Sequence, residues 1–122
     1  MEMPSQDNFK PFVVHLILNK QTEQALDLLA KEYRVAVPRL QVGLPKGHIR
    51  NAYGTYSSGD QTICVMDSDV FGNPFVILHE FYHHLRTSED SKHRGTERYA
   101  DAFAEEFIQA YSSITFQETG NH

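Results

Sequence analysis

The chain lacks the residues that mark several specialised classes of protein. It contains one cysteine and no tryptophan among 122 residues. The single cysteine, Cys64, excludes an intramolecular disulfide, which suits a reducing compartment, and we expect it to be a small buried side chain. No run of lysine and arginine occurs, and the net charge is -5. The sequence therefore gives no electrostatic support for nucleic-acid binding.

Long apolar runs are also absent. The longest one near the N-terminus, residues 11–18, is far shorter than the roughly 20 residues of a transmembrane helix, and it includes His15. The first residues have neither the basic start nor the apolar centre of a secretory signal. We therefore expect a cytoplasmic protein with no membrane partner.

The length and composition indicate an ordinary globular domain. With 40% hydrophobic and 22% charged residues, the chain has enough apolar side chains for one core. We expect a single domain over residues 1–122, with flexible tails at 1–8 and 115–122. From residue 9 to 35, apolar residues recur every three or four positions, except in a polar gap near Asn19. This spacing predicts one long helix, or two helices with a break near Asn19.

Strand and turn residues occupy the middle of the chain. Residues 39–44 alternate between apolar and polar side chains, which predicts a short strand. Residues 51–56 and 61–66 are rich in β-branched and aromatic residues, and the intervening SSGD is typical of a turn. This arrangement predicts a β-hairpin. The expected fold is α+β, with a long N-terminal helix or helix pair, a small twisted sheet of about three strands, and two further helices.

The two further helices are predicted in the C-terminal half. Asn73 followed by Pro74 is a typical helix start, because an N-cap residue precedes proline at the first helical position. We expect this helix to run to about Arg86. After a polar loop, a second helix should begin near residue 95 or 96 and end near Ser113.

The first of these helices carries the sequence H-E-x-x-H. His79 and His83 are four residues apart, slightly more than one helical turn, so their imidazoles point the same way. Two such imidazoles can bind one zinc ion, and Glu80 beside them can act as general base and acid. A pair of histidines buried only for packing is the alternative. His84 lies about 100° further round the helix, and we expect a surface or helix-packing residue there.

A catalytic zinc ion needs a third protein ligand and an open coordination position. Glu97 follows His83 by 14 residues, and the intervening polar loop lets the chain fold back toward the histidines. Asp101, four residues later, lies on the same helical face and can accept the other N–H of a ligating histidine. His93 is the rival third ligand, although it lies in the polar loop. His122 is a more remote candidate.

These motifs resemble those of a known group of enzymes. HEFYHHL followed by TERYADAFAEEF resembles the gluzincin metallopeptidases, in which H-E-x-x-H precedes a helix with E-x-x-x-D. The pair also resembles the ImmA/IrrE-type zinc peptidase domain, whose glutamate helix typically has E-x-E-A-N-x-F-A. Tyr99 and Asp101 depart from that second pattern, and Asp101 favours the gluzincin assignment. The short chain is similar to the minigluzincins, and the motif match covers about residues 74–107.

The resemblance implies a zinc-dependent endopeptidase that hydrolyses a peptide or protein substrate. Zinc would be held by His79, His83 and Glu97, with Glu80 as general base and acid and Asp101 orienting a histidine. No residue is assigned to stabilise the oxyanion, and the oligomeric state is left open.

Further expectations come from the same resemblance. In minigluzincins it implies latency, with a C-terminal segment lying in the cleft. A strand near residues 51–57 or 61–66, beside the metal helix, is expected to bind substrate by β-augmentation, although packing alone would also explain the sheet. Two other functions stay open. One is a metal-binding regulatory or interaction module without turnover, and the other is a peptidase that acts on a single partner such as a repressor.

Overall fold

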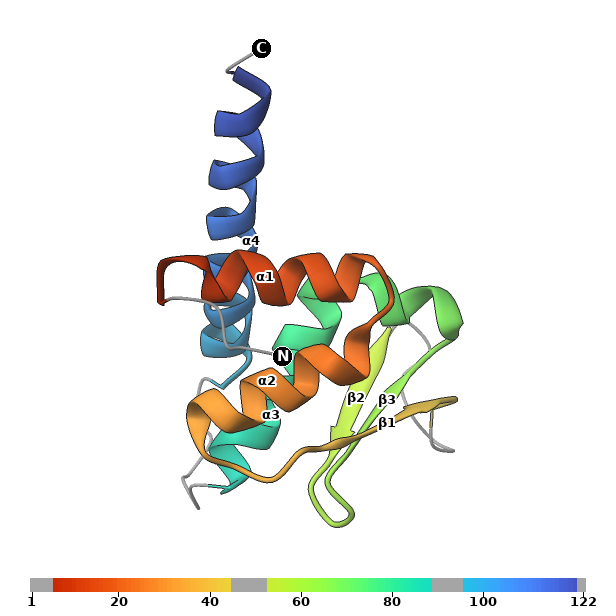
Figure 1. The fold of residues 1–122 in the computed structure, drawn as a ribbon. Coiled ribbons are helices and arrows are strands. Elements are labelled where there is room, and N and C mark those ends of the chain that lie inside the picture. Colours follow the sequence, from red (N-terminus) through yellow and green to blue (C-terminus); the bar gives the residue numbers. More distant parts are fainter. Residues whose placement is uncertain (1–5, 45–52, 89–95, 121–122) are drawn as a thin grey trace.

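The structure is a computed structural model that describes residues 6–44, 53–88 and 96–120. Within these residues it is α+β, as predicted, and the helices lie to one side of a three-stranded sheet (Figure 1). The helices in chain order are α1 (Gln6–Leu18), α2 (Thr22–Tyr33), the 3-10 helix η1 (Ser68–Gly72), α3 (Pro74–Ser88) and α4 (Thr96–Gly120). The strands are β1 (Arg39–Val42), β2 (Gly54–Ser57) and β3 (Thr62–Val65).

The N-terminal region forms two helices with a break near Asn19, which is the second of the two predicted alternatives. Lys20 adopts a left-handed conformation with φ 61°, and its backbone N–H donates to the Ile17 carbonyl at 2.9 Å. A left-handed residue with such a bond is a common way to end a helix. The sharp turn lets both α1 and α2 bury apolar faces in the same core.

The sheet is mixed, with β3 in the centre. β3 pairs antiparallel with β2, which confirms the predicted hairpin, and parallel with β1. All four residues of β3 are buried, including Cys64 as expected. Because both sides of β3 are paired, β1 and β2 are the edge strands of the sheet that the described residues form.

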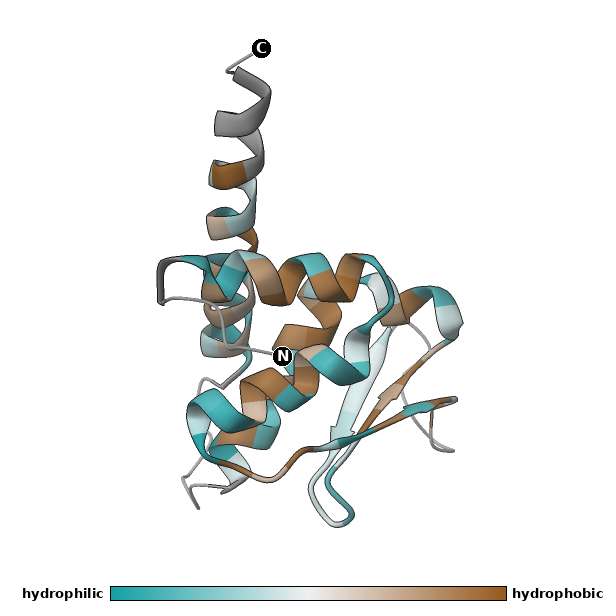
Figure 2. Ribbon diagram, viewed as in Figure 1, coloured by the Kyte–Doolittle hydropathy of each residue, from teal (hydrophilic) through white to brown (hydrophobic). Residues whose placement is uncertain are grey.

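The core lies where the helices meet one another and the sheet. Hydrophobic residues concentrate on α1, α3 and β3 (Figure 2). The largest fully buried side chains include Val13, Ile17, Leu29, Ile63, Ile77, Phe81 and Phe107. None of the helices in the described part of the chain has the length and apolar character needed to span a membrane.

The last helix is longer than predicted. α4 continues to Gly120, beyond the expected end near Ser113, so residues 115–120 extend the helix where the sequence predicted a tail. No glycine or proline interrupts residues 96–119, which explains why the helix runs on. Its first half packs against α1 and α3, whereas its second half projects beyond the body of the domain (Figure 1).

Candidate metal centre

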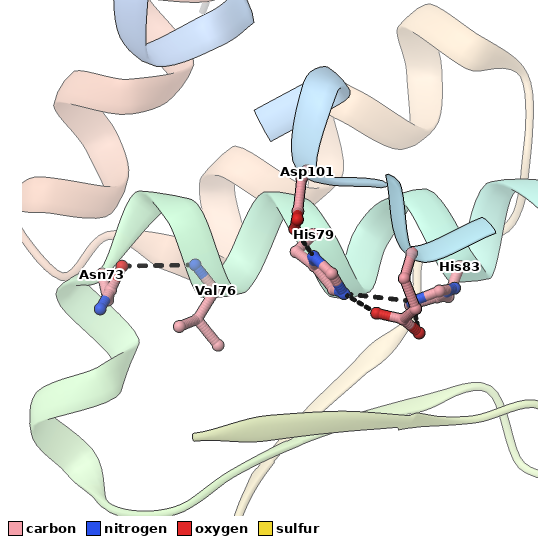
Figure 3. Close-up of polar contacts among 6 residues, drawn as sticks. Asn73, Val76, His79, His83 and Asp101 are labelled. Carbon is pink, nitrogen blue, oxygen red and sulfur yellow. Dashed lines mark hydrogen bonds and ion pairs between the residues drawn. The ribbon is translucent and has the colours of Figure 1, made fainter. Parts of the chain in front are cut away.

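Helix α3 carries the H-E-x-x-H residues, and local signals fix where it begins. The Asn73 side-chain oxygen accepts a hydrogen bond from the Val76 backbone N–H at 3.3 Å, which confirms the predicted N-cap (Figure 3). Ile77, Leu78 and Phe81 are fully buried, so they fix the rotation of α3 against the core. This setting leaves the two histidines of the motif partly exposed on another side of the helix.

The two histidines converge as their spacing predicts. The Nε2 atoms of His79 and His83 are 3.3 Å apart (Figure 3). The rings meet edge to face, with an interplanar angle of 69°. Both Nε2 atoms therefore point into the same small space beside α3.

Glu97, in the first turn of α4, brings its carboxylate into the same volume. One oxygen lies 2.8 Å from His79 Nε2, and the other lies 3.2 Å from His83 Nε2. Ala100 and Ala104 on α4 are fully buried, and their small side chains let α4 come close to its neighbours. The Glu97 side chain is 78% exposed, so the cluster is open to solvent on the α4 side.

The separations in this cluster suit a bound metal ion. Ligand atoms bound tetrahedrally to zinc at about 2.0–2.1 Å lie about 3.3–3.4 Å from one another. The two histidine Nε2 atoms here are 3.3 Å apart, and they lie 2.8 and 3.2 Å from different oxygens of the Glu97 carboxylate. His79, His83 and Glu97 each offer one ligand atom, and these atoms lie within 4.8 Å of one another. The three residues could therefore hold a metal ion.

Asp101 contacts His79 from the far side of the ring. Its Oδ1 atom lies 2.9 Å from His79 Nδ1 (Figure 3). A carboxylate can only accept, so Nδ1 carries the proton, and in neutral imidazole Nε2 then has a lone pair. That lone pair faces a Glu97 oxygen at 2.8 Å, an arrangement of two acceptors that requires a proton or a cation between them. The contact is the one predicted for Asp101, and it leaves Nε2 available to a metal ion.

Glu80 is a buried carboxylate beside the histidines, with only 7% of its surface exposed. Burial raises the pKa of Glu80 to about 7, because an ionised carboxylate loses hydration there. The nearby His79 lowers this pKa, and the negative charge of Glu97 raises it. A cation in the cluster would favour the ionised form of Glu80 and lower the pKa. Without a bound cation, Glu80 can therefore exchange a proton near neutral pH.

Strand β2 lies directly against this part of α3. A Cβ atom placed on Gly54 would be 2.8 Å from a Val76 methyl group and 3.7 Å from Glu80 Cγ. No side chain fits in that space, so glycine allows the strand backbone to approach the helix closely. One turn further along α3, the next contact between strand and helix is made by Tyr56 and His84.

His84 is the residue whose role the sequence did not predict. It is fully buried, so of the two predicted alternatives the surface position is wrong and the packing position holds. Its Nε2 atom lies 2.7 Å from the Ala36 carbonyl, so Nε2 carries the proton, and Nδ1 accepts a hydrogen bond from the Tyr56 hydroxyl at 2.6 Å. Burial lowers the pKa of His84, which favours this neutral form. The side chain thus ties α3 to β2 and to the segment before β1.

Other sequence-based candidates lie away from the cluster. His93 and His122 fall outside the described residues. Residues 115–120 continue α4 away from its first turn, where Glu97 lies beside His79 and His83 (Figure 1). In this conformation these residues do not cover the cluster in the way that the minigluzincin resemblance implies.

Comparisons with known proteins add no assignment. The chain matches no family model, no curated protein and no solved structure. The resemblance to gluzincins therefore rests on the motifs alone, and the geometry of the described residues supports a metal-binding cluster.

Proposed function

We propose that the protein is a zinc-dependent peptidase whose metal ligands are His79, His83 and Glu97. The observation that supports this most is the convergence of two imidazole nitrogens and one carboxylate next to the buried Glu80. A set of two histidines and one glutamate is a common catalytic zinc site, because it leaves a coordination position open. A purely structural site closes all positions with protein ligands and needs no buried carboxylate beside it.

Zinc, when bound, would act as a Lewis acid and lower the pKa of a water molecule from about 15.7 toward 7. Glu80 would accept the proton of the attacking water and later deliver it to the departing amine. Asp101 would keep His79 in the tautomer that presents Nε2 to the cluster. Glu80 and Asp101 thus have different tasks, proton transfer for the first and ligand orientation for the second.

Among the described residues the outer edge of β2 is unpaired, and it supplies a place for an extended substrate. β3 is paired on both sides, so of the two strands expected to bind substrate only β2 remains. Gly54 places the β2 backbone beside Glu80, and the Tyr56 hydroxyl bonds to His84 on the same helix. A peptide that adds a strand to this edge would lie along α3, near the metal cluster.

Two measurements test the proposal. Zinc content by elemental analysis should approach one ion per chain in the wild type and fall strongly in Glu97→Ala. A mixed peptide library, digested and read by mass spectrometry, should show cleavages by the wild type that disappear in Glu80→Gln. Glu105→Gln is the matched control, because Glu105 is an exposed carboxylate on α4. We expect it to retain both zinc and cleavage.

The outcomes separate the possible functions. Zinc binding without any cleavage that depends on Glu80 would replace the peptidase proposal with a metal-binding module. Equal zinc content in Glu97→Ala and in the wild type would remove the proposed ligand set. Cleavage of one protein partner only, with none in the library, would point to the single-partner peptidase.

A further inference from the structure

Two residues of β2 have backbone groups that face away from the rest of the sheet. The Met66 N–H donates to the Tyr53 carbonyl at 2.8 Å, so these two residues form a hydrogen-bonded pair at the end of the β2–β3 ladder. Bonded pairs alternate with non-bonded pairs along an antiparallel ladder, and the next bonded residue on β2 is therefore Thr55. The N–H and C=O groups of Gly54 and Tyr56 then point away from β3, to the side where the proposed substrate strand would lie.

The same two residues face α3 with their side-chain positions. A Cβ atom on Gly54 would lie 2.8 Å from a Val76 methyl group, and the Tyr56 hydroxyl donates to His84 Nδ1 at 2.6 Å. Residues two apart on a strand have side chains on the same side, which agrees with both contacts. One pair of residues therefore carries the outward peptide groups of β2 and its contacts with the metal helix.

His84 gives the Tyr56 hydroxyl a fixed acceptor. Its ring is fully buried, and its Nε2 atom donates to the Ala36 carbonyl at 2.7 Å. The ring also packs against Phe81, with the centroids 5.7 Å apart, and meets the Tyr56 ring edge to face at 5.3 Å. Because both ring nitrogens are bonded, the direction in which Nδ1 points is set by the core rather than by β2.

We infer that Tyr56 and His84 form a positioning pair, which holds the outward peptide groups of β2 in a fixed place relative to the metal ligands on α3. His84 directly follows the proposed ligand His83 in the sequence. The pair thus joins the strand that would bind an extended peptide to the helix that would bind zinc. This inference rests on the proposed peptidase function, in which β2 receives the substrate.

The position of β2 matters because the substrate would be aligned through it. β2 is an edge strand of the described sheet and is bonded to β3 on one side. A displacement of about 1 Å between reacting groups can lower a rate about 100-fold. One hydrogen bond corresponds to about a tenfold difference in the populations of two positions. The bond between Tyr56 and His84 is therefore strong enough to decide how much of the protein has β2 in the aligned position.

Steady-state cleavage of one peptide, chosen from the library products of the wild type, tests the pair. Tyr56→Phe keeps the ring and removes the hydroxyl. When it is saturated with zinc and assayed well below its unfolding temperature, its kcat should be about tenfold lower than that of the wild type. Its KM should change little, because the outward peptide groups still bind the substrate. Its zinc affinity should equal that of the wild type.

A second measurement does not depend on turnover. The peptide carries ¹³C at the carbonyl of the bond that is cleaved, and it is bound to Glu80→Gln loaded with Co²⁺, a paramagnetic ion that can share such ligands. Relaxation of this carbon by the ion falls steeply with distance. We expect weaker relaxation when Tyr56→Phe is added, since the peptide then spends less time in the aligned position.

Two controls separate positioning from general stability. Tyr33→Phe makes the same change at a tyrosine on α2 that packs against Phe81, and it should keep wild-type kcat. Ile17→Val removes a methyl group from a fully buried side chain on α1, so it should lower stability without lowering kcat. An equal fall of kcat in Ile17→Val and Tyr56→Phe would overturn the inference.

The remaining outcomes distinguish the inference from the proposed function. Wild-type kcat and unchanged ¹³C relaxation in Tyr56→Phe would overturn the positioning role and leave the peptidase proposal intact. A raised KM with unchanged kcat, or a loss of zinc affinity, would likewise overturn it, because the pair would then act on substrate affinity or on the metal. No cleavage by the wild type would remove the proposed function, and the inference with it.

Discussion

Removing the Asp101 carboxylate tests how the metal cluster is organised. Asp101 holds His79 through a 2.9 Å contact at Nδ1, which fixes both the ring orientation and the tautomer. Loss of such a partner typically weakens metal affinity 10- to 100-fold, which corresponds to about 1.4–2.8 kcal/mol. We therefore expect Asp101→Ala to bind zinc with an affinity reduced by one to two orders of magnitude. Glu97→Ala should bind zinc more weakly still, because it removes a ligand.

The assay is competition between the protein and a fluorescent zinc chelator near neutral pH. Glu105→Ala is the control, because it removes an exposed carboxylate one turn further along α4 and should keep wild-type affinity. Asp101→Asn keeps an acceptor oxygen without the charge and should fall between the wild type and Asp101→Ala. Thermal unfolding of the zinc-free proteins should show that all variants are folded. Equal zinc affinity of Asp101→Ala and Glu105→Ala would refute the assigned role of Asp101.

Further predictions concern stability. The pKa of Glu80 is about 7 in the folded protein and 4.5 in the unfolded chain, so its contribution to stability is present below pH 4.5 and is lost as the pH rises through 7. In urea denaturation of the zinc-free protein, the free energy of unfolding of Glu80→Gln should rise relative to that of the wild type, by up to about 3 kcal/mol, as the pH increases from 4.5 to 7. A difference between the two proteins that does not change with pH would contradict this. Gly54→Ala should lower the free energy of unfolding by about 1–3 kcal/mol, because its Cβ would lie 2.8 Å from a Val76 methyl group. Gly59→Ala should leave the free energy of unfolding nearly unchanged, because its Cβ would have no atom within 4 Å. Tyr56→Phe leaves the buried Nδ1 of His84 without a hydrogen-bond donor, so it should lower the free energy of unfolding by about 1–3 kcal/mol in the same assay. A change within experimental error would show that this hydrogen bond contributes little to stability. Zinc at 100 times its dissociation constant should raise the free energy of unfolding by about 2.7 kcal/mol, and no increase would mean that the folded state does not bind the ion preferentially.

Features encoded by neighbouring residues were predictable from the sequence. The start of α3 follows from Asn73 and Pro74, and the hairpin follows from its turn residues. The convergence of His79 and His83 follows from helical geometry, since a spacing of four residues places both rings on one side. In each case the signal lies within a few residues of the feature.

Features that depend on distant partners were not predictable in the same way. His84 bonds to Tyr56 and to Ala36, which are 28 and 48 residues away in the sequence. Helical periodicity placed His84 on a different face of the helix from His79 and His83. It could not show whether the face that carries His84 is exposed to solvent or packed against another element. The parallel pairing of β1 with β3 likewise joins separate segments that no short motif connects. Glu97 was an intermediate case, because the motif suggested it and only the packing of α4 on α3 brings it to the histidines.

The arrangement of ligands on both α3 and α4 has a consequence for the integrity of the chain. His83 and Glu97 lie on opposite sides of the segment that joins the two helices, 14 residues apart. An ion bound by both His83 and Glu97 would act as a cross-link that closes the short loop between the two helices. A protein cut by an external protease between residues 89 and 95 would then stay in one piece while the ion is bound. Without the ion, its two fragments would be held by the packing of α4 against the rest of the domain and by polar contacts such as that between His79 and Asp101.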